Sequence, residues 1–201
     1  KGHGTVVTLR RLKHSSPISL ESLEQALARR FSNRVKGEMK IALNGAPLGE
    51  PNIDVESRVP ASGMKTEVLP DGNEIKYWYA YSKEVLATKE LRGFTILVRG
   101  KTAQAPPFFF DIEGTASGQH GTRYLFGSIE ADFIDDGSDD ASDIISTDRQ
   151  EIDWETSATK GLLEWGQKLS RKALINWVEM RGKKALKVTL SDDKLSERIA
   201  R

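Results

Sequence analysis

The chain of 201 residues is 38% hydrophobic and 29% charged, an ordinary globular composition with room for one large or two small domains. It contains no cysteine, which excludes disulfides, thiolate metal sites and cysteine nucleophiles and fits a reducing cytoplasm. The 30 Lys and Arg residues nearly balance the 29 Asp and Glu residues, so the net charge alone does not indicate a polyanionic partner. No apolar run reaches the length of about 18 residues that a membrane-spanning helix needs.

The N-terminal residues predict a strand, a helix and a hairpin. β-Branched residues favour a strand from about Gly4 to Leu12. Ser19 is a suitable N-cap for an amphipathic helix of about three turns, whose apolar positions are Leu20, Leu23, Leu27 and Phe31. Asn44-Gly45 lies between two short apolar runs and predicts a type I′ hairpin. We assign residues 1–48 to one unit.

The middle of the chain predicts a connection followed by strands. Residues 49–74 contain spaced Pro and Gly and are interpreted as an extended connection or a domain junction. Alternation predicts a strand at 75–82, and a second strand is expected at 92–101 as its neighbour in the sheet. Pro106-Pro107 excludes a central strand there, and the following Phe triplet is expected to pack under the sheet. Residues 122–134 predict the last strand.

The C-terminal part predicts helices. After an acidic loop, a long helix of about 24 residues is expected within 157–183, and Ser191 with Asp192 and Asp193 indicates the cap of a further helix. A stripe on the long helix is expected to face the core: Leu162, Leu169, Ala173, Trp177 and Met180. The predicted fold class is α+β, with a mixed sheet covered by helices.

Three stretches carry a resemblance to a known family. Gly4-Thr5 opening a strand, RGFTILVRGK at 92–101, and YLFGSIEADFIDDGSDDASDIISTDRQEIDWE at 124–155 resemble the GHKL ATPases, which include gyrase B, MutL, the MORC proteins and the ninety-kilodalton heat-shock chaperone. The resemblance implies that residues 1–48 are the terminal strand, helix and hairpin of the nucleotide-binding domain. Residues 49–74 would be the connection, and residues 75–201 the transducer domain with a left-handed βαβ crossover.

The resemblance also implies functional residues. Arg149 matches the transducer cation that contacts the γ-phosphate of ATP, with Gln150 as its polar neighbour, and Gly4 and Thr5 match the adenine-pocket pair. ATP and Mg would be bound by the longer parent protein, with neither expected on this fragment alone, because the catalytic Glu and the Mg-binding Asn would lie upstream. One position departs from the chaperone pattern: Asp153 replaces the Gln expected four residues after the arginine.

Other interpretations remain open. Arg149 could instead pair with Asp148 or Asp153 on the surface. The acidic run at 135–143 lacks the spacing of a calcium loop, and His3, His14 and His120 lack ligand spacing, so no metal site is predicted. Trp154, Trp165 and Trp177 could stack on nucleic-acid bases, but core packing of at least one of them is the safer interpretation.

The expected partners depend on whether the chain belongs to a GHKL protein or is an interaction module. In a GHKL protein they would be the upstream nucleotide-binding domain, a second copy in a homodimer, and a protein client or DNA. The rival function is an interaction module that binds through residues 49–74 and 157–183. A basic band on the long helix keeps weak DNA-phosphate binding open: Lys168, Arg171, Lys172, Arg181, Lys183, Lys184 and Lys187.

Overall fold

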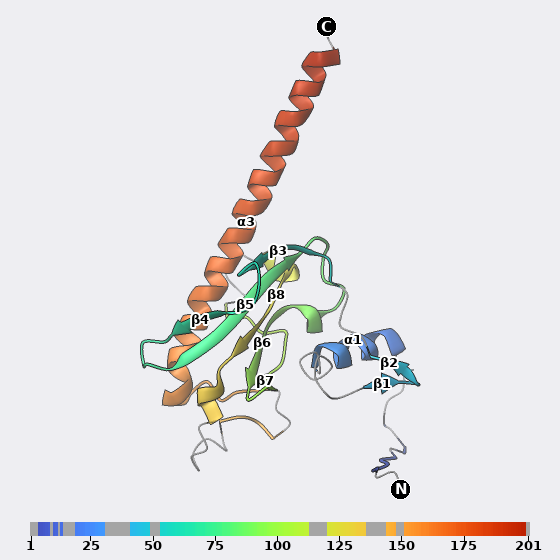
Figure 1. The fold of residues 1–201 in the computed structure, drawn as a ribbon, viewed down its shortest axis with the longest axis vertical. Helices are drawn as coiled ribbons and strands as arrows, with labels where there is room; N and C mark the ends of the chain where they lie inside the picture. Colours follow the sequence, from blue (N-terminus) through green and yellow to red (C-terminus); the bar gives the residue numbers. More distant parts are fainter. Residues whose placement is uncertain are drawn as a thin grey trace.

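The computed structural model describes residues 4–8, 10, 11, 13, 19–30, 41–48, 53–112, 120–135, 144–147 and 151–199. Within them the fold is α+β, as predicted (Figure 1). A six-stranded mixed sheet lies against the long helix α3 (Ser157–Ile199), and a smaller N-terminal group holds α1 (Leu20–Arg30) and a two-stranded hairpin.

Two of the three predicted N-terminal elements are present. Helix α1 follows Ser19, whose carbonyl accepts the Leu23 N–H at 3.0 Å. Strands β1 (Ala42–Leu43) and β2 (Ala46–Pro47) pair around Asn44 and Gly45. The φ angles of these two turn residues are +51° and +83°, the left-handed values that a type I′ turn requires. The predicted hairpin and helix are therefore confirmed.

The strand predicted from Gly4 to Leu12 is wrong for the residues described in that range. Residues 4–8, 10 and 11 have no strand structure. Val6 and Val7 are 91% and 79% exposed, so the β-branched residues that favour a strand have no sheet neighbour packed against them. Strand propensity without cross-strand partners does not hold an extended chain in a sheet.

The main sheet has the order β3-β5-β8-β6-β7, with β4 pairing with β5. Its strands are β3 (Val55–Val59), β4 (Lys65–Val68), β5 (Glu74–Ser82), β6 (Gly93–Val98), β7 (Lys101–Gln104) and β8 (Leu125–Glu130). Strands β6 and β8 are parallel, and the other pairs are antiparallel. The expectation that the strands at 75–82 and 92–101 are neighbours is wrong, because β8 is inserted between β5 and β6.

The range 92–101, predicted as one strand, contains strand β6, a turn and the first residue of strand β7. Strand β6 ends at Val98, and Arg99 and Gly100 have φ of +50° and +70°. This left-handed pair reverses the chain into β7, which pairs antiparallel with β6.

The expectation that residues 49–74 form an extended connection is wrong where β3 and β4 lie. Both strands pair antiparallel with β5, β3 with its second half and β4 with its first half. Residues 60–64 separate them. The Arg58 guanidinium donates to the carbonyl oxygens of Pro60 at 2.6 Å and Gly63 at 2.7 Å, which holds this turn against the end of β3. The domain boundaries at 48 and 75 stay predictions.

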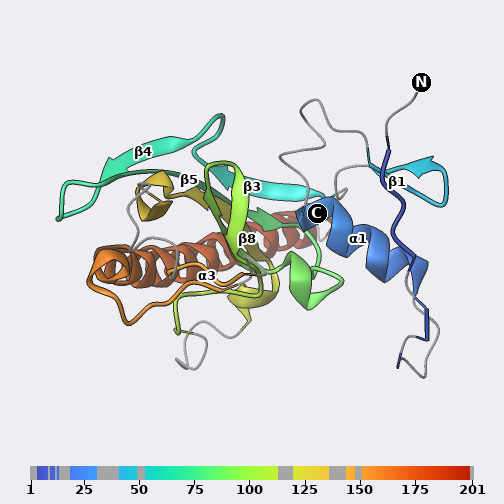
Figure 2. The ribbon, with the colours of Figure 1, turned by 90° about the horizontal axis from the view of Figure 1, so that it is seen from below.

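Helix α3 lies along one face of the sheet and continues well beyond it (Figures 1 and 2). It is one helix of 43 residues, so the expectations of about 24 residues and of a separate helix after Ser191 are wrong. No Gly or Pro follows Gly182 within it, so nothing in the sequence stops the helix before Ser191. None of the helices in the described part of the chain has the length and apolarity to cross a membrane.

The core lies between α3 and the sheet. Alternate residues of β5 face the helix, namely Ile75, Tyr77, Tyr79 and Tyr81. The predicted helical stripe meets them: Leu162, Leu169 and Ala173 are buried, and Trp177 and Met180 pack against the same cluster. The Phe triplet at 108–110 is buried there too, as expected. The opposite face of the sheet has a smaller cluster formed by Ala80, Leu86, Leu91 and Phe126.

Candidate functional site

The candidate site is a short hairpin whose two described sides, residues 144–147 and 151–153, flank Arg149 in the sequence. Ile145 and Ile152 form an antiparallel bridge. The Ser146 N–H donates to the carbonyl of Glu151 at 2.9 Å, and the Asp153 N–H donates to that of Ile144 at 2.8 Å. Arg149 and Gln150 lie between these two sides but outside the described residues. We call the described residues 144–147 and 151–153 the sensor hairpin, after the role proposed for it below.

The base of the sensor hairpin is anchored to the edge of the main sheet. The Gln104 side chain, at the end of β7, is 9% exposed. Its Oε1 accepts the Ile152 N–H at 3.1 Å and the Trp154 Nε1–H at 3.3 Å. Ile144 and Ile152 are themselves buried. The base of the hairpin is therefore fixed by both a buried polar clamp and apolar packing.

Aromatic packing holds the second side of the sensor hairpin. The Trp154 ring stacks on Phe108 at a centroid distance of 5.2 Å and meets Phe110 edge-on at 5.7 Å. Trp165 meets Tyr77 edge-on at 5.0 Å, and Trp177 stacks on Tyr124 at 5.2 Å. All three tryptophans pack against the core, so the core interpretation is confirmed over a free stacking platform.

The sensor hairpin joins α3 with almost no spacer. The Asp153 carbonyl accepts a hydrogen bond from the Thr159 hydroxyl at 2.8 Å, and the Asp153 carboxylate accepts the Glu155 N–H at 2.9 Å. Thr159 lies in the first turn of α3 and is fully buried. A displacement of Asp153 would thus be transmitted to the first turn of α3.

Among the described residues, no contact joins the other predicted site residues to the sensor hairpin. Gly4 and Thr5 are exposed, and a Cβ built at Gly4 would have no atom within 4 Å. His120 is exposed, whereas His3, His14 and acidic residues 136–143 lie outside the described part. Within the described ranges, no three His, Asp or Glu side chains gather in a way that could hold a metal ion.

The basic band is exposed for most of its length. Six of its members are exposed on α3: Lys168, Arg171, Lys172, Lys183, Lys184 and Lys187. Arg181 is half-buried and engaged in contacts described below. The band therefore remains compatible with binding an anionic surface, and Lys184 is also committed to an ion pair within the chain.

Sequence reasoning missed a carboxylate that ties β4 to α3. Glu67 accepts hydrogen bonds from Lys65 Nζ at 2.6 Å, Tyr77 Oη at 3.1 Å and Trp165 Nε1 at 2.8 Å. Burial raises the pKa of Glu67, but these hydrogen bonds outweigh burial and hold its pKa below the usual value.

Burial also raises the pKa of Tyr81, whose hydroxyl donates to the Ala173 carbonyl of α3 at 2.6 Å. No sequence signal pairs residues so far apart.

Comparison with models of protein families, with curated proteins and with solved structures gives no match.

Replacing Gln104 with Leu is expected to loosen the sensor hairpin. The substitution keeps the size of the side chain but leaves the Ile152 N–H and the Trp154 indole N–H without their acceptor, at a cost of about 1–3 kcal/mol for an unsatisfied buried donor. Hydrogen exchange of the Ile152 amide should accelerate about 5- to 150-fold, the factor that corresponds to this loss of free energy. The control is Lys101→Gln, at an exposed position on the same strand. Unchanged exchange at Ile152 in the Leu variant would show that Gln104 does not anchor the hairpin.

Proposed function

We propose that the chain is part of a GHKL-type ATPase, in which residues 75–201 form the transducer domain and residues 1–48 the end of the nucleotide-binding domain. The longer protein would bind ATP and Mg, with Gly4 and Thr5 at the adenine pocket. The left-handed crossover that the resemblance implies would lie between the parallel strands β6 and β8. The observation that carries the proposal is the sensor hairpin, anchored at its base and joined directly to α3.

In this proposal Arg149 senses the nucleotide. Phosphoryl transfer places growing negative charge on the γ-phosphate oxygens, and a guanidinium delivered from a second domain would stabilise that charge. Gln150 would be its polar neighbour. Gln104 and the stacked Trp154 join the hairpin base to the sheet edge and the core, so the hairpin and this edge of the sheet would move together when Arg149 binds the nucleotide. Asp153 connects that movement to the first turn of α3.

Helix α3 would be the output element. It is 43 residues long, which at 1.5 Å per residue corresponds to about 65 Å. A small rotation at its first turn would therefore produce a large displacement at its far end. In the parent protein this displacement would reach the partner subunit, a protein client or DNA.

The proposal is tested by steady-state ATP hydrolysis in the polypeptide extended upstream. Arg149→Ala is expected to lower turnover about 100-fold, on the order of 3 kcal/mol of transition-state stabilisation, with nucleotide binding retained. Arg171→Ala, which removes an exposed arginine from α3, serves as the control and should keep the wild-type rate. An unchanged rate in Arg149→Ala would place that arginine on the surface, away from the γ-phosphate.

The rival function is a non-catalytic interaction module that uses the exposed basic band. Between residues 160 and 187 the exposed acidic residues of α3 are Glu164 and Glu179, far fewer than the exposed cations. An acidic or nucleic-acid partner would fit this excess. Determining the coding sequence upstream would distinguish the ATPase from the interaction module. Only the ATPase requires the Asn/Glu helix and the Asp-x-Gly-x-Gly segment there.

A further inference from the structure

Glu56 lies at an irregularity in the edge strand β3. The pairing of β3 with β5 changes register between Val55 and Ser57, so Glu56 has no partner across the ladder. Such a bulge re-aims a side chain relative to a regular strand. The Glu56 side chain is only 13% exposed although β3 lies at the sheet edge. The bulge therefore places a carboxylate in a largely buried position.

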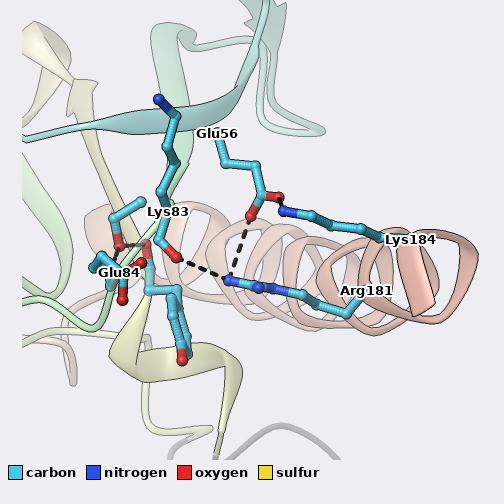
Figure 3. A network of polar contacts seen from close by, with 7 residues as sticks. Glu56, Lys83, Glu84, Arg181 and Lys184 are labelled. Atoms are coloured by element: carbon cyan, nitrogen blue, oxygen red, sulfur yellow. Dashed lines mark hydrogen bonds and ion pairs between the residues drawn. The ribbon is translucent and has the colours of Figure 1, made fainter. Parts of the chain in front are cut away.

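Two cations of α3 meet this carboxylate (Figure 3). Lys184 Nζ lies 2.7 Å from Oε1 of Glu56, and Arg181 Nη2 lies 3.3 Å from Oε2. Both pairs join residues far apart in the sequence, so they fasten the helix to the sheet rather than stabilise the helix alone.

Arg181 is held by further contacts. Its Nη2 donates to the Lys83 carbonyl at 3.1 Å, just beyond the end of β5. Its guanidinium carbon lies 4.9 Å from the ring centroid of Tyr124 and 5.7 Å from that of Trp177. Cation–π attraction and this hydrogen bond fix the guanidinium from two further directions. The side chain is thus committed to one position on the sheet.

This network lies where α3 leaves the body of the protein. Residues 182–187 are all exposed, and a Cβ built at Gly182 would have no atom within 4 Å. Figure 1 shows the helix continuing past the sheet from this region. We call residues 182–199 the projecting half of α3. The contacts of Arg181 and Lys184 with Glu56 are therefore at the base of the projecting half.

The burial of Glu56 gives these contacts more weight than exposed ion pairs have. Exposed pairs contribute about 0–1 kcal/mol. If α3 turned away from the sheet at Arg181, both cations would leave, and a carboxylate that is 13% exposed would remain without a charged partner. An unpaired buried charge is strongly unfavourable. The network therefore opposes a change in the direction of the helix.

We propose that Glu56 is a positioning residue that fixes the direction in which the projecting half of α3 leaves the sheet. Because β3 is the first strand of the sheet after the N-terminal group, Glu56 also links the chain arriving from that group to the helix. The role of α3 as output rests on the proposed function, whereas the fixing of its direction does not. Asp153 contacts the first turn of α3 and Glu56 the point where the helix leaves the sheet, while the Glu67 and Tyr81 contacts lie between them.

Because the chain contains no cysteine, two introduced cysteines can be labelled selectively to test this proposal. Spin labels at Glu74→Cys and Lys187→Cys, both exposed positions, report the distance between β5 and the projecting half by pulsed electron spin resonance. With Glu56→Gln the distance distribution is expected to become at least twofold wider. Glu179→Gln, which removes an exposed carboxylate from the same helix, is the control and should leave the distribution unchanged.

Lys184→Gln provides a second variant, because the Lys184 side chain is 60% exposed and folding should be retained. It is expected to widen the distribution less than Glu56→Gln does, and the double variant no more than Glu56→Gln alone. Unchanged distributions in both single variants would overturn the proposal. No nucleotide is present in these measurements, so their outcome is independent of the Arg149→Ala result.

Discussion

Replacing Gly93 with Ala is expected to destabilise the protein by about 2–5 kcal/mol. Gly93 begins β6 with φ of +77°, a conformation that costs residues with a Cβ about 1–2 kcal/mol. The added Cβ would also lie 2.3 Å from the Phe108 carbonyl oxygen and 2.9 Å from its nitrogen. These are backbone atoms, and the same carbonyl accepts the Phe94 N–H at 2.8 Å, so the clash cannot be relieved by rotating a side chain. Overpacking of this kind adds about 1–3 kcal/mol.

Chemical denaturation of the wild type and variant measures this loss. Gly100→Ala is the matched control, because Gly100 has φ of +70° and no atom within 4 Å of a built Cβ. The control should lose only about 1–2 kcal/mol from the backbone conformation. If both variants lost the same stability, the close approach of residue 108 to β6 would not be the cause.

The second large effect is expected for Phe110→Ala, at about 3–5 kcal/mol. Phe110 is fully buried, with ring centroids 4.7 Å from Phe108 and 5.7 Å from Trp154. Its ring also abuts α3, since a Cβ built at Gly166 would lie 2.2 Å from it. The truncation therefore removes packing under the sensor hairpin and against the helix together.

Denaturation gives the size of the Phe110 effect, and near-ultraviolet circular dichroism reports the Trp154 environment. Phe110→Leu is the control and should cost less than about 1.5 kcal/mol, because it keeps most of the apolar volume. A loss below about 1 kcal/mol in the alanine variant would show that Phe110 does not join the hairpin to the core.

The elements that the sequence predicts well are those determined by neighbouring residues. Helix α1 follows from its apolar spacing and its cap, the hairpin from Asn44-Gly45, and the inward residues of β5 from strict alternation. Strand order is different, because it depends on contacts between distant segments. No local pattern shows that β8 enters between β5 and β6, or that β3 and β4 complete the edge along β5.

Helix ends and functional contacts are also set by distant residues. The cap-like Ser191 does not begin a new helix, because residues 183–190 contain no Gly or Pro and are mostly Lys, Ala and Leu, so α3 continues through it. For the site, only the resemblance pointed to Arg149. The clamp on the sensor hairpin comes from Gln104 on another strand, and the partners of Glu56 come from the far end of the chain. Such pairings have no signature in a single sequence.

The divided edge formed by β3 and β4 bears on how the protein avoids aggregation. A long, flat edge strand offers unpaired backbone groups on which another sheet can grow. Here the edge is split into strands of five and four residues, and the turn between them is held by Arg58. The second strand also begins with an exposed lysine, Lys65, a residue that opposes edge-to-edge pairing. We therefore expect this side of the sheet to resist recruitment into intermolecular β-structure while the chain folds.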